Sequence, residues 1–441
     1  MTKTILTIAF LLTIGQTALA QNFDQAKLDS YFQALEAHNK FMGSVAVSKN
    51  GAIIYKKSVG FADLENQVKA SELSKYRIGS ISKTFTAVLV LKAVEDKKLT
   101  LQQTLDKWFP TIPNAHKITL QHLLRHRSGI HNFTENEDFL SWNTQAKTKA
   151  EMVEIISKGG SVFEPDTQAE YSNSNYVLLS YILEAVYGKP YAEILQTYIV
   201  QPVGLQHTYV FGKINTQNNE CKSYNFIGNW KEESETDFTI PLGAGAIVSA
   251  PTDLTKFADA LFAGKLLQPE SLETMKTVKD GFGLGLFPIP FYDKSGYGHT
   301  GGIDGFRSVY AHFDDGNISY ALSSNGTMFD INDISIAVLS AIYGKPYDIP
   351  TFSKSTYEVR SSDLDQYLGV YATNTLPLKI TVTKEGHTLV AQATGQSSFP
   401  LEAIEKDRFQ YEEAGIIMEF NPQEKTMLLH QGGGKFVFTK E

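Results

Sequence analysis

The sequence predicts an α/β (α+β) protein: an antiparallel sheet flanked by helices, an all-helical subdomain inserted into that sheet, and a small C-terminal β domain. Three observations carry this prediction. Strand-like runs occur in pairs near residues 43–62 and 305–324. The long section between the two pairs has mainly helical and loop character. From residue 364 onward the apolar residues alternate with polar ones, as β-strands require.

The first half of the chain predicts a helix, a hairpin and a second helix in that order. Residues 24–40 have a helical pattern, and residues 43–62 form two apolar runs around Asn50-Gly51, a strong hairpin signal. Residues 84–98 are helical again. Residues 117–270 are expected to be helix and loop, with Pro165, Pro202, Pro241 and Pro251 as breakers.

The second half predicts the return of the sheet and then a separate domain. Strands are expected at residues 305–313 and 318–324, joined by a turn at 314–317, with a helix near 330–343. Prolines and a Ser/Thr-rich stretch at 345–362 have the composition of a linker. We therefore expect a main domain at 21–348, a linker at 349–362 and an antiparallel barrel or sandwich at 363–441.

The first twenty residues have the features of a secretory signal. Lys3 precedes an apolar run at residues 5–12, and Ala18-Leu19-Ala20 stands before Gln21 as an A-x-A cleavage site. A membrane anchor is the alternative, but the run is short and is interrupted at residues 15–17. We expect an exported bacterial protein, periplasmic or secreted, with no membrane span in the mature chain. A single cysteine, Cys221, excludes an intramolecular disulfide.

Charge and motif content exclude some partners. Lys and Arg number 40 against 48 Asp and Glu, a net charge of −8, which argues against nucleic acid as a partner. No glycine-rich phosphate loop is present, and we expect no cofactor. His122 and His126 have the spacing of a zinc-binding helix, but Leu123 stands where that motif needs glutamate, so we expect no metal.

Ser80-Ile81-Ser82-Lys83 opens a strongly apolar helical run and is the only place where a lysine follows a serine by three residues. Side chains at i and i+3 lie on one face of a helix, so the Lys83 amine can reach the Ser80 hydroxyl. A Ser–Lys couple is a known form of nucleophile activation. By itself this pattern arises by chance, and Ser80 could instead cap the helix.

Two further segments complete a candidate active site, namely Tyr171-Ser172-Asn173 and His299-Thr300-Gly301-Gly302. Each alone is consistent with an ordinary turn, and Ser-x-Asn recurs at 223–225 and 323–325. The three motifs in this order are far more specific than any one of them.

These motifs, with Arg77-Ile-Gly before Ser80 and Leu123-Leu-Arg-His126-Arg-Ser-Gly129, resemble the serine β-lactamase and penicillin-binding protein superfamily. The similarity covers about residues 25–345. It is greatest to the branch of class C β-lactamases, D-aminopeptidases, DD-carboxypeptidases and related esterases, the peptidase S12 type. The C-terminal β domain is an addition to that unit.

The resemblance implies a role for each motif residue. Ser80 would attack a carbonyl carbon to form an acyl-enzyme, Lys83 would hold or accept the proton, and Tyr171 would relay protons. Asn173 would position the substrate and Lys83. The backbone N–H groups of Ser80 and Gly302 would form the oxyanion hole.

The glycine-rich motif would position the substrate through His299, Thr300 and Gly301, on an edge strand that the substrate backbone approaches closely. Many members of the superfamily have lysine at the position of His299. Because histidine is only partly charged near neutral pH, the resemblance implies weaker dependence on a substrate carboxylate.

Three functions remain open on this basis. The first is an exported serine hydrolase of the DD-peptidase, D-aminopeptidase or esterase type, acting on a small molecule or peptide through a Ser80 acyl-enzyme. The second is a class C-like β-lactamase, which deacylates rapidly. The third is a catalytically slow or inactive penicillin-binding-type sensor or scaffold. The oligomeric state is not predicted.

Overall fold

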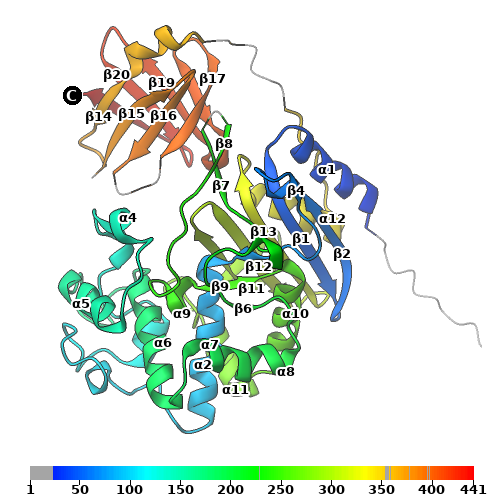
Figure 1. The fold of residues 1–441 in the computed structure, drawn as a ribbon, viewed down its shortest axis with the longest axis vertical. Coiled ribbons are helices and arrows are strands. Elements are labelled where there is room, and N and C mark those ends of the chain that lie inside the picture. The colour runs from blue at the N-terminus through cyan, green and yellow to red at the C-terminus, as the bar shows by residue number, and fades with distance from the viewer. Residues whose placement is uncertain are drawn as a thin grey trace, which may run out of the picture.

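A computed structural model describes residues 23–441 apart from 228, 353–356, 358, 377, 395 and 397. The expected signal segment and part of the expected linker lie outside the described residues. Figure 1 shows a central sheet with helices on both sides, a largely helical section beside it, and a barrel at the C-terminus. None of the helices in the described ranges combines the length and apolar character needed to cross a bilayer.

The central sheet has six strands in the order β10-β11-β12-β13-β1-β2, and all neighbours are antiparallel. The strands are β1 Phe41–Lys49, β2 Ala52–Val59, β10 Phe287–Phe291, β11 Lys294–Ile303, β12 Phe306–Phe313 and β13 Ile318–Thr327. The two predicted strand pairs join where Val45 of β1 pairs with Leu322 of β13. The predicted fold class is confirmed.

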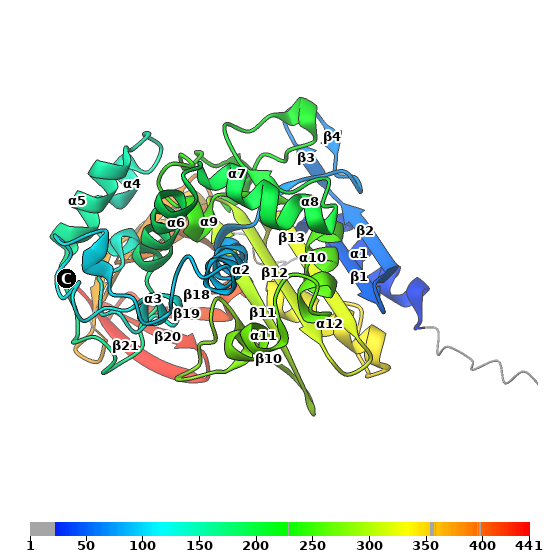
Figure 2. The same ribbon diagram turned by 90° about the horizontal axis from the view of Figure 1, so that it is seen from below.

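Helices cover both faces of this sheet (Figure 2). On one face, α1 Gln25–Ala37 and α12 Ile331–Tyr343 share an apolar core with residues of β1, β12 and β13. On the other, α2 Ser82–Glu95 and α10 Pro251–Phe262 belong to the larger core. Helix α2 is buried on nearly all sides, because it is enclosed by α6 Asn173–Tyr187, α9 Leu242–Gly245 and α11 Pro269–Lys276 as well as by the turn before it.

The section between the strand pairs is helical at first and then mixed. Its helices are α3 Leu120–Leu124, α4 Phe139–Trp142, α5 Lys149–Gly159, α6 Asn173–Tyr187, α7 Tyr191–Leu195, α8 Gln201–Val203, α9 Leu242–Gly245 and α11 Pro269–Lys276. Short strands also occur: β5 Tyr76–Arg77, β6 Tyr209–Val210 and β9 Ile247–Ser249 form one small sheet, and β7 Tyr224–Ile227 pairs with β8 Asn229–Glu232. The sequence did not predict these strands, because runs of two to four residues are too short to show a period of two.

The C-terminal strands close into an eight-stranded barrel, which decides between the two predicted forms. They are β14 Gly369–Ala372, β15 Lys379–Glu385, β16 Thr388–Ala393, β17 Phe399–Glu405, β18 Arg408–Tyr411, β19 Ile416–Asn421, β20 Thr426–Gln431 and β21 Gly434–Lys440. The pair Tyr371 and Lys440 closes the ring, and the interior is a packed apolar core.

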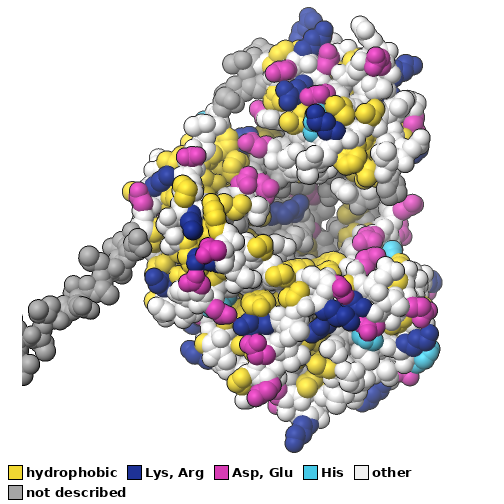
Figure 3. Space-filling view, turned by 180° about the vertical axis from the view of Figure 1, so that it is seen from behind, with side chains coloured by type: hydrophobic (Ala, Val, Ile, Leu, Met, Phe, Trp, Pro, Cys, Tyr) yellow, Lys and Arg dark blue, Asp and Glu magenta, His cyan; other side chains and the backbone are white. Residues whose placement is uncertain are grey.

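The barrel contacts the rest of the molecule through few elements. Strand β17 lies against β7, Lys231 of β8 pairs with Glu385, and Lys40 Nζ lies 3.3 Å from Glu412 Oε2. The surface is hollowed between the barrel and the rest of the molecule (Figure 3). The barrel therefore has its own core and is attached by a narrow contact.

Candidate active site

Ser80 lies on a tight turn that leads into α2. The chain leaves β5, makes a single 3₁₀ turn at Gly79–Ile81 and enters the helix at Ser82. Gly79 has φ +52°, and a Cβ there would lie 2.8 Å from the backbone nitrogen of Gly302. Only glycine fits this position, because the conformation is left-handed and the space is occupied.

Lys83 lies one helical turn after Ser80 and is fully buried. Its Nζ lies 2.9 Å from Ser80 Oγ, 2.8 Å from Asn173 Oδ1 and 2.7 Å from the carbonyl oxygen of Ala244. None of the ion pairs between described residues includes Lys83. Burial lowers the pKa of the Lys83 amine well below its usual range. The amine is therefore poised to be neutral and to accept a proton.

Tyr171 stands on the opposite side of the Ser80 hydroxyl. Its phenolic O–H donates to Ser80 Oγ at 2.7 Å, from the residue two positions before α6. Burial raises the pKa of the phenol, so it stays protonated near neutral pH. Ser80 Oγ therefore lies between a protonated phenol and an amine.

Asn173 is the first residue of α6 and is held from two sides. Its Oδ1 accepts from Lys83, while its Nδ2 donates to Asn132 Oδ1 at 3.2 Å and to Thr134 Oγ1 at 3.1 Å. These bonds fix which side of the amide faces the lysine. The sequence analysis did not predict roles for Asn132, Thr134 or the carbonyl of Ala244. These groups hydrogen-bond to Asn173 or Lys83 from other parts of the chain, and no sequence motif marks them.

The glycine-rich motif occupies the end of β11 and packs against the turn that carries Ser80. A Cβ on Gly301 would lie 2.0 Å from the carbonyl oxygen of Ile78 and 3.0 Å from the backbone nitrogen of Ser80. The edge-strand expectation needs a correction, since β10 lies outside β11. Prolines 288 and 290 in β10 hid that strand from the sequence analysis, although proline is tolerated at a sheet edge. Pairing with β10 stops at Gly298, so residues 299–303 have no ladder partner on that side within the described strands.

His299 is buried and neutral. Its Nδ1–H donates to the carbonyl oxygen of Thr300, and its ring centroid lies 4.5 Å from that of Phe287. Burial, and next the nearby Lys83, lower the pKa of His299 to about 3. The position where lysine is common in the superfamily thus has no positive charge near neutral pH.

Six of the eight predicted site residues line one cavity of about 430 Å³. The other two, Lys83 and Asn173, are not part of its lining, but they are hydrogen-bonded to each other, and Lys83 is hydrogen-bonded to Ser80. The lining of the cavity consists of Ser80, Tyr171, Phe282, Phe287, His299, Thr300, Gly301 and Gly302. None of these lining side chains is charged near neutral pH. The sequence analysis did not single out Phe282 and Phe287, because aromatic residues outside a motif are more often part of the core.

His126 holds Tyr171 from three directions. Its carbonyl oxygen accepts from Glu170 N–H at 2.9 Å, its Nδ1 accepts from Ser172 N–H at 3.1 Å, and its ring stacks on Tyr171 at 4.5 Å. His126 has φ +56°, an uncommon conformation for a residue with a side chain. Burial lowers the pKa of His126 well below its usual range.

The ring nitrogens of His122 and His126, the pair with zinc-helix spacing, accept hydrogen bonds from backbone N–H groups. His122 Nδ1 accepts from Thr119 N–H at the start of α3, and His126 lies beyond the end of that helix. Within the residues that the structure describes, no group of three or more His, Cys, Asp and Glu side chains is placed to hold a metal ion.

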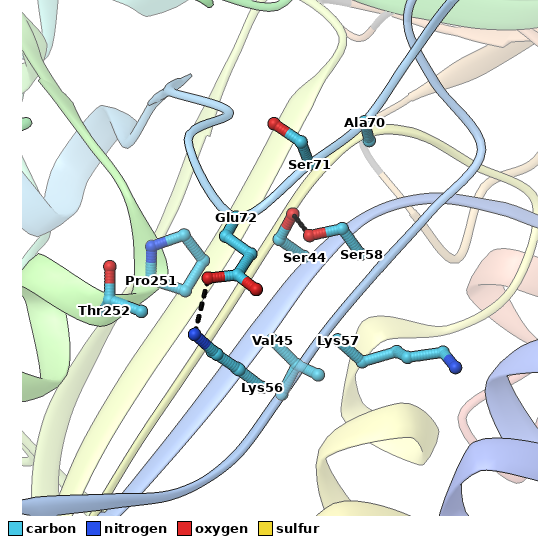
Figure 4. Close-up of a pocket in the computed structure, with 10 residues that line it drawn as sticks. All are labelled: Ser44, Val45, Lys56, Lys57, Ser58, Ala70, Ser71, Glu72, Pro251 and Thr252. Carbon is cyan, nitrogen blue, oxygen red and sulfur yellow. Dashed lines mark hydrogen bonds and ion pairs between the residues drawn. The ribbon is translucent and has the colours of Figure 1, made fainter.

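A second hollow, of about 330 Å³, lies near the opposite edge of the sheet between β1, β2 and the start of α10 (Figure 4). Lys56 pairs with Glu72 at 2.5 Å, Lys57 pairs with Asp29 at 3.3 Å, and Ser44 Oγ lies 2.8 Å from Ser58 Oγ. These groups are paired with one another and form no nucleophile–base couple.

Comparison with known proteins agrees with this geometry. The family model described as Beta-lactamase matches residues 28–339. Penicillin-binding protein 4* of Bacillus subtilis (strain 168) is 25% identical over 442 residues, covering 92% of this chain and 97% of that protein. A teichoic acid D-alanine hydrolase of Staphylococcus aureus (strain MRSA252) is 28% identical over 250 residues, covering 55% of this chain and 59% of that protein.

Two solved structures extend the comparison. The D-amino acid amidase of Ochrobactrum anthropi SV3, complexed with D-phenylalanine, superposes with a TM-score of 0.64 at 25% identity and covers 72% of this chain and 98% of that one. The octameric penicillin-binding protein homologue of Pyrococcus abyssi has a TM-score of 0.64 at 23% identity and covers 94% of this chain and 100% of that one, which shows a shared fold.

The fold, the cavity at Ser80 and the matched length define a class. The chain belongs to the Beta-lactamase family. It is a serine hydrolase of that family.

Proposed function

We propose that this protein hydrolyses an amide or ester bond of a small substrate derived from a D-amino acid, through an acyl-enzyme on Ser80. One observation carries the proposal: Ser80 Oγ lies 2.9 Å from a buried amine and 2.7 Å from a protonated phenol. This arrangement supplies a proton acceptor and a proton donor on either side of one nucleophile.

The proton path follows from the states of these groups. The neutral Lys83 amine takes the Ser80 hydroxyl proton as Oγ bonds to the substrate carbonyl carbon. The negative charge that forms on the carbonyl oxygen is stabilised by the N–H groups of Ser80 and Gly302. The Tyr171 O–H then protonates the leaving amine or alkoxide and is reprotonated from Lys83. Water enters by the reverse path and releases the acid.

The environment of His299 supports a neutral leaving group. A neutral imidazole beside Phe287, with Phe282 close by, offers an apolar surface and no cation for a terminal carboxylate. The names of two relatives, a teichoic acid D-alanine hydrolase and a D-amino acid amidase, are consistent with such substrates. We therefore favour amidase or esterase activity over cleavage of peptides with a free C-terminal carboxylate.

We also propose that the protein is exported with residues 1–20 removed, and that residues 21–348, 349–362 and 363–441 act as hydrolase domain, linker and barrel domain. Support comes from the A-x-A signal pattern and from the separate apolar core of the barrel. N-terminal sequencing of the protein from the producing cell should begin near Gln21.

The decisive experiment is intact mass after exposure to a fluorophosphonate, for the wild type and for Ser80→Ala. The wild type should gain one adduct and the variant none. Equal labelling of both proteins would overturn the assignment of Ser80. Turnover of D-aminoacyl amides and short esters would then support the hydrolase. Rapid hydrolysis of a chromogenic cephalosporin would point instead to a β-lactamase, and a permanent adduct without turnover to a sensor.

A further inference from the structure

Arg307 is a cation beside the end of β11. It stands on β12 and pairs in register with Gly302. Its Nη1 donates to the carbonyl oxygens of Asp304 at 3.1 Å and Phe306 at 2.9 Å. The ion pairs of the described residues do not include Arg307. Arg77, by contrast, pairs with both Glu235 and Asp304.

The Arg307 side chain lies beside Gly302 of β11. A Cβ at Gly302 would stand 3.6 Å from Arg307 Nη1 and 3.7 Å from its Cδ, within ordinary contact distance. Gly302 itself is exposed, and Arg307 is half-buried. The side chains of Thr300 and Arg307 are diagonal neighbours on one face of the β11–β12 pair. The guanidinium thus adjoins the exposed end of the motif that lines the cavity.

The surroundings of the glycine-rich motif differ in charge between its two ends. At one end, ring contacts run from Tyr171 through His126, Phe282 and Phe287 to His299, with centroid distances of 4.5 to 5.5 Å. That end holds the phenol that would protonate the leaving group, and none of the side chains that line the cavity there is charged near neutral pH. Gly302 lies at the other end of the motif, with the Arg307 guanidinium beside it. The acyl half of a substrate would extend past Gly302 in that direction.

We propose that Arg307 binds a carboxylate carried by the acyl half of the substrate. This inference rests on the proposed function, because the Gly302 N–H must hold the reacting carbonyl for the acyl half to reach Arg307. The guanidinium has five N–H donors, and Nη1 alone makes the two carbonyl bonds seen here, so Nη2 and Nε have donors available for an anion. The substrate class is an acid-bearing acyl donor with a neutral leaving group.

Two matched esters test the proposal on the full chain. One is the p-nitrophenyl monoester of adipic acid, and the other is the same compound with its free carboxyl group as a methyl ester. Leaving group and chain length are nearly the same, so the ratio of their kcat/KM values reports recognition of the charge. The wild type should prefer the acid by roughly tenfold at low salt, as one charge-assisted contact allows, and less at high salt.

Arg307→Gln should bring this ratio to about one while the methyl ester is hydrolysed within about twofold of the wild-type rate, and Arg307→Lys should keep part of the preference. Arg360→Gln removes an arginine whose partner is Asp363, just before the barrel, and should leave the ratio unchanged. A wild-type ratio near one, or the same ratio in Arg307→Gln, overturns the carboxylate site.

A second measurement covers the case in which Arg307→Gln does not fold. Adipate dianion should then slow wild-type hydrolysis of the methyl ester more strongly than dimethyl adipate does. Equal inhibition contradicts the proposal. Failure of the proposed function can be told apart from failure of the Arg307 site. If Ser80 is not the nucleophile, neither ester would form an adduct on Ser80.

Discussion

Arg77 and Asp304 form a buried ion pair that joins two of the three active-site motifs. Arg77 Nη1 lies 3.0 Å from Asp304 Oδ2, and the side chains are 2% and 3% exposed. Arg77 stands three residues before Ser80, and Asp304 stands two residues after Gly302. Asp304 Oδ1 also accepts from Thr236 N–H and Oγ–H. The pair therefore holds the nucleophile turn and the end of β11 at a fixed separation.

Breaking this pair should destabilise the protein and slow acylation together. Asp304→Ala leaves the buried guanidinium with one acidic partner, Glu235, and removes the acceptor of Thr236, so we expect a loss of about 3 kcal/mol in the free energy of unfolding. Urea denaturation measures it. Lys158→Ala, which removes an exposed pair with Glu154, is the control and should cost less than about 1 kcal/mol. Equal effects of the two variants would show that the buried pair has no special role.

The rate of acylation should depend on the protonation of Lys83. Because burial lowers the pKa of this amine, the reactive neutral form should increase as pH rises through a value well below the ordinary one for lysine. The pH profile of kcat/KM should therefore have a rising limb. Lys83→Arg, which keeps a positive charge at every accessible pH, should lose activity by about a hundredfold or more. Wild-type activity in that variant would contradict a proton-accepting role.

His299 should make the protein sensitive to acid. Its pKa is about 3 in the folded chain and near 6.5 in the unfolded chain, so below pH 6.5 the unfolded state binds the extra proton. Stability is therefore lost as pH falls from 6.5 towards 3. Between pH 7 and pH 4.5, the loss due to His299 should be about 2–3 kcal/mol.

The matching variant is His299→Gln, which cannot gain that charge. Its free energy of unfolding should fall less between pH 7 and pH 4.5 than that of the wild type, whatever the values at pH 7. His126, whose pKa burial also lowers well below its usual range, contributes acid sensitivity in both proteins. Parallel pH dependence in the two proteins would mean that His299 is protonated to the same extent in the folded and unfolded states.

His126 should act as a positioning residue for Tyr171. His126→Phe keeps an aromatic ring but loses the Nδ1 acceptor for Ser172 N–H, whereas His126→Asn keeps an acceptor and loses the ring. Misplacement of the phenol should lower kcat by about 10- to 100-fold with a smaller change in KM. A higher kcat for His126→Asn than for His126→Ala would identify the hydrogen bond to Ser172 N–H as the main contribution. Parallel changes in kcat and thermal stability across all variants would indicate a structural role only.

Removal of the barrel should leave the nucleophile reactive. The residues of its core all lie between Val359 and Phe438, and the cavity is lined only by residues before it. A chain that ends at residue 354 should therefore fold and gain the fluorophosphonate adduct, with an altered substrate range or solubility. A folded truncation that gains no adduct would show that the barrel completes the site.

Local signals predicted the parts of the fold that depend on neighbouring residues. Asn50-Gly51 marks the first hairpin. Lys83 Nζ lies 2.9 Å from Ser80 Oγ because the chain between the two residues is helical. The resemblance to a family predicted that Tyr171 and His299 lie near Ser80. No rule based on neighbouring residues brings these distant segments together. The carbonyl of Ala244, the amide of Asn132 and the strand β10 were missed, because their roles depend on tertiary contacts that sequence periodicity does not encode.

The pairing of β1 with β13 has a consequence for the order of events during synthesis. Val45 leaves the ribosome long before Leu322, yet the two must meet to complete the sheet. Until then β11 cannot pair with β12, and β12 cannot pair with β13. The turn that carries Ser80 then has no backbone of Gly301 and Gly302 to pack against. A nascent or prematurely terminated chain would therefore be inert, and reactivity would arise only when nearly the whole hydrolase unit has been made.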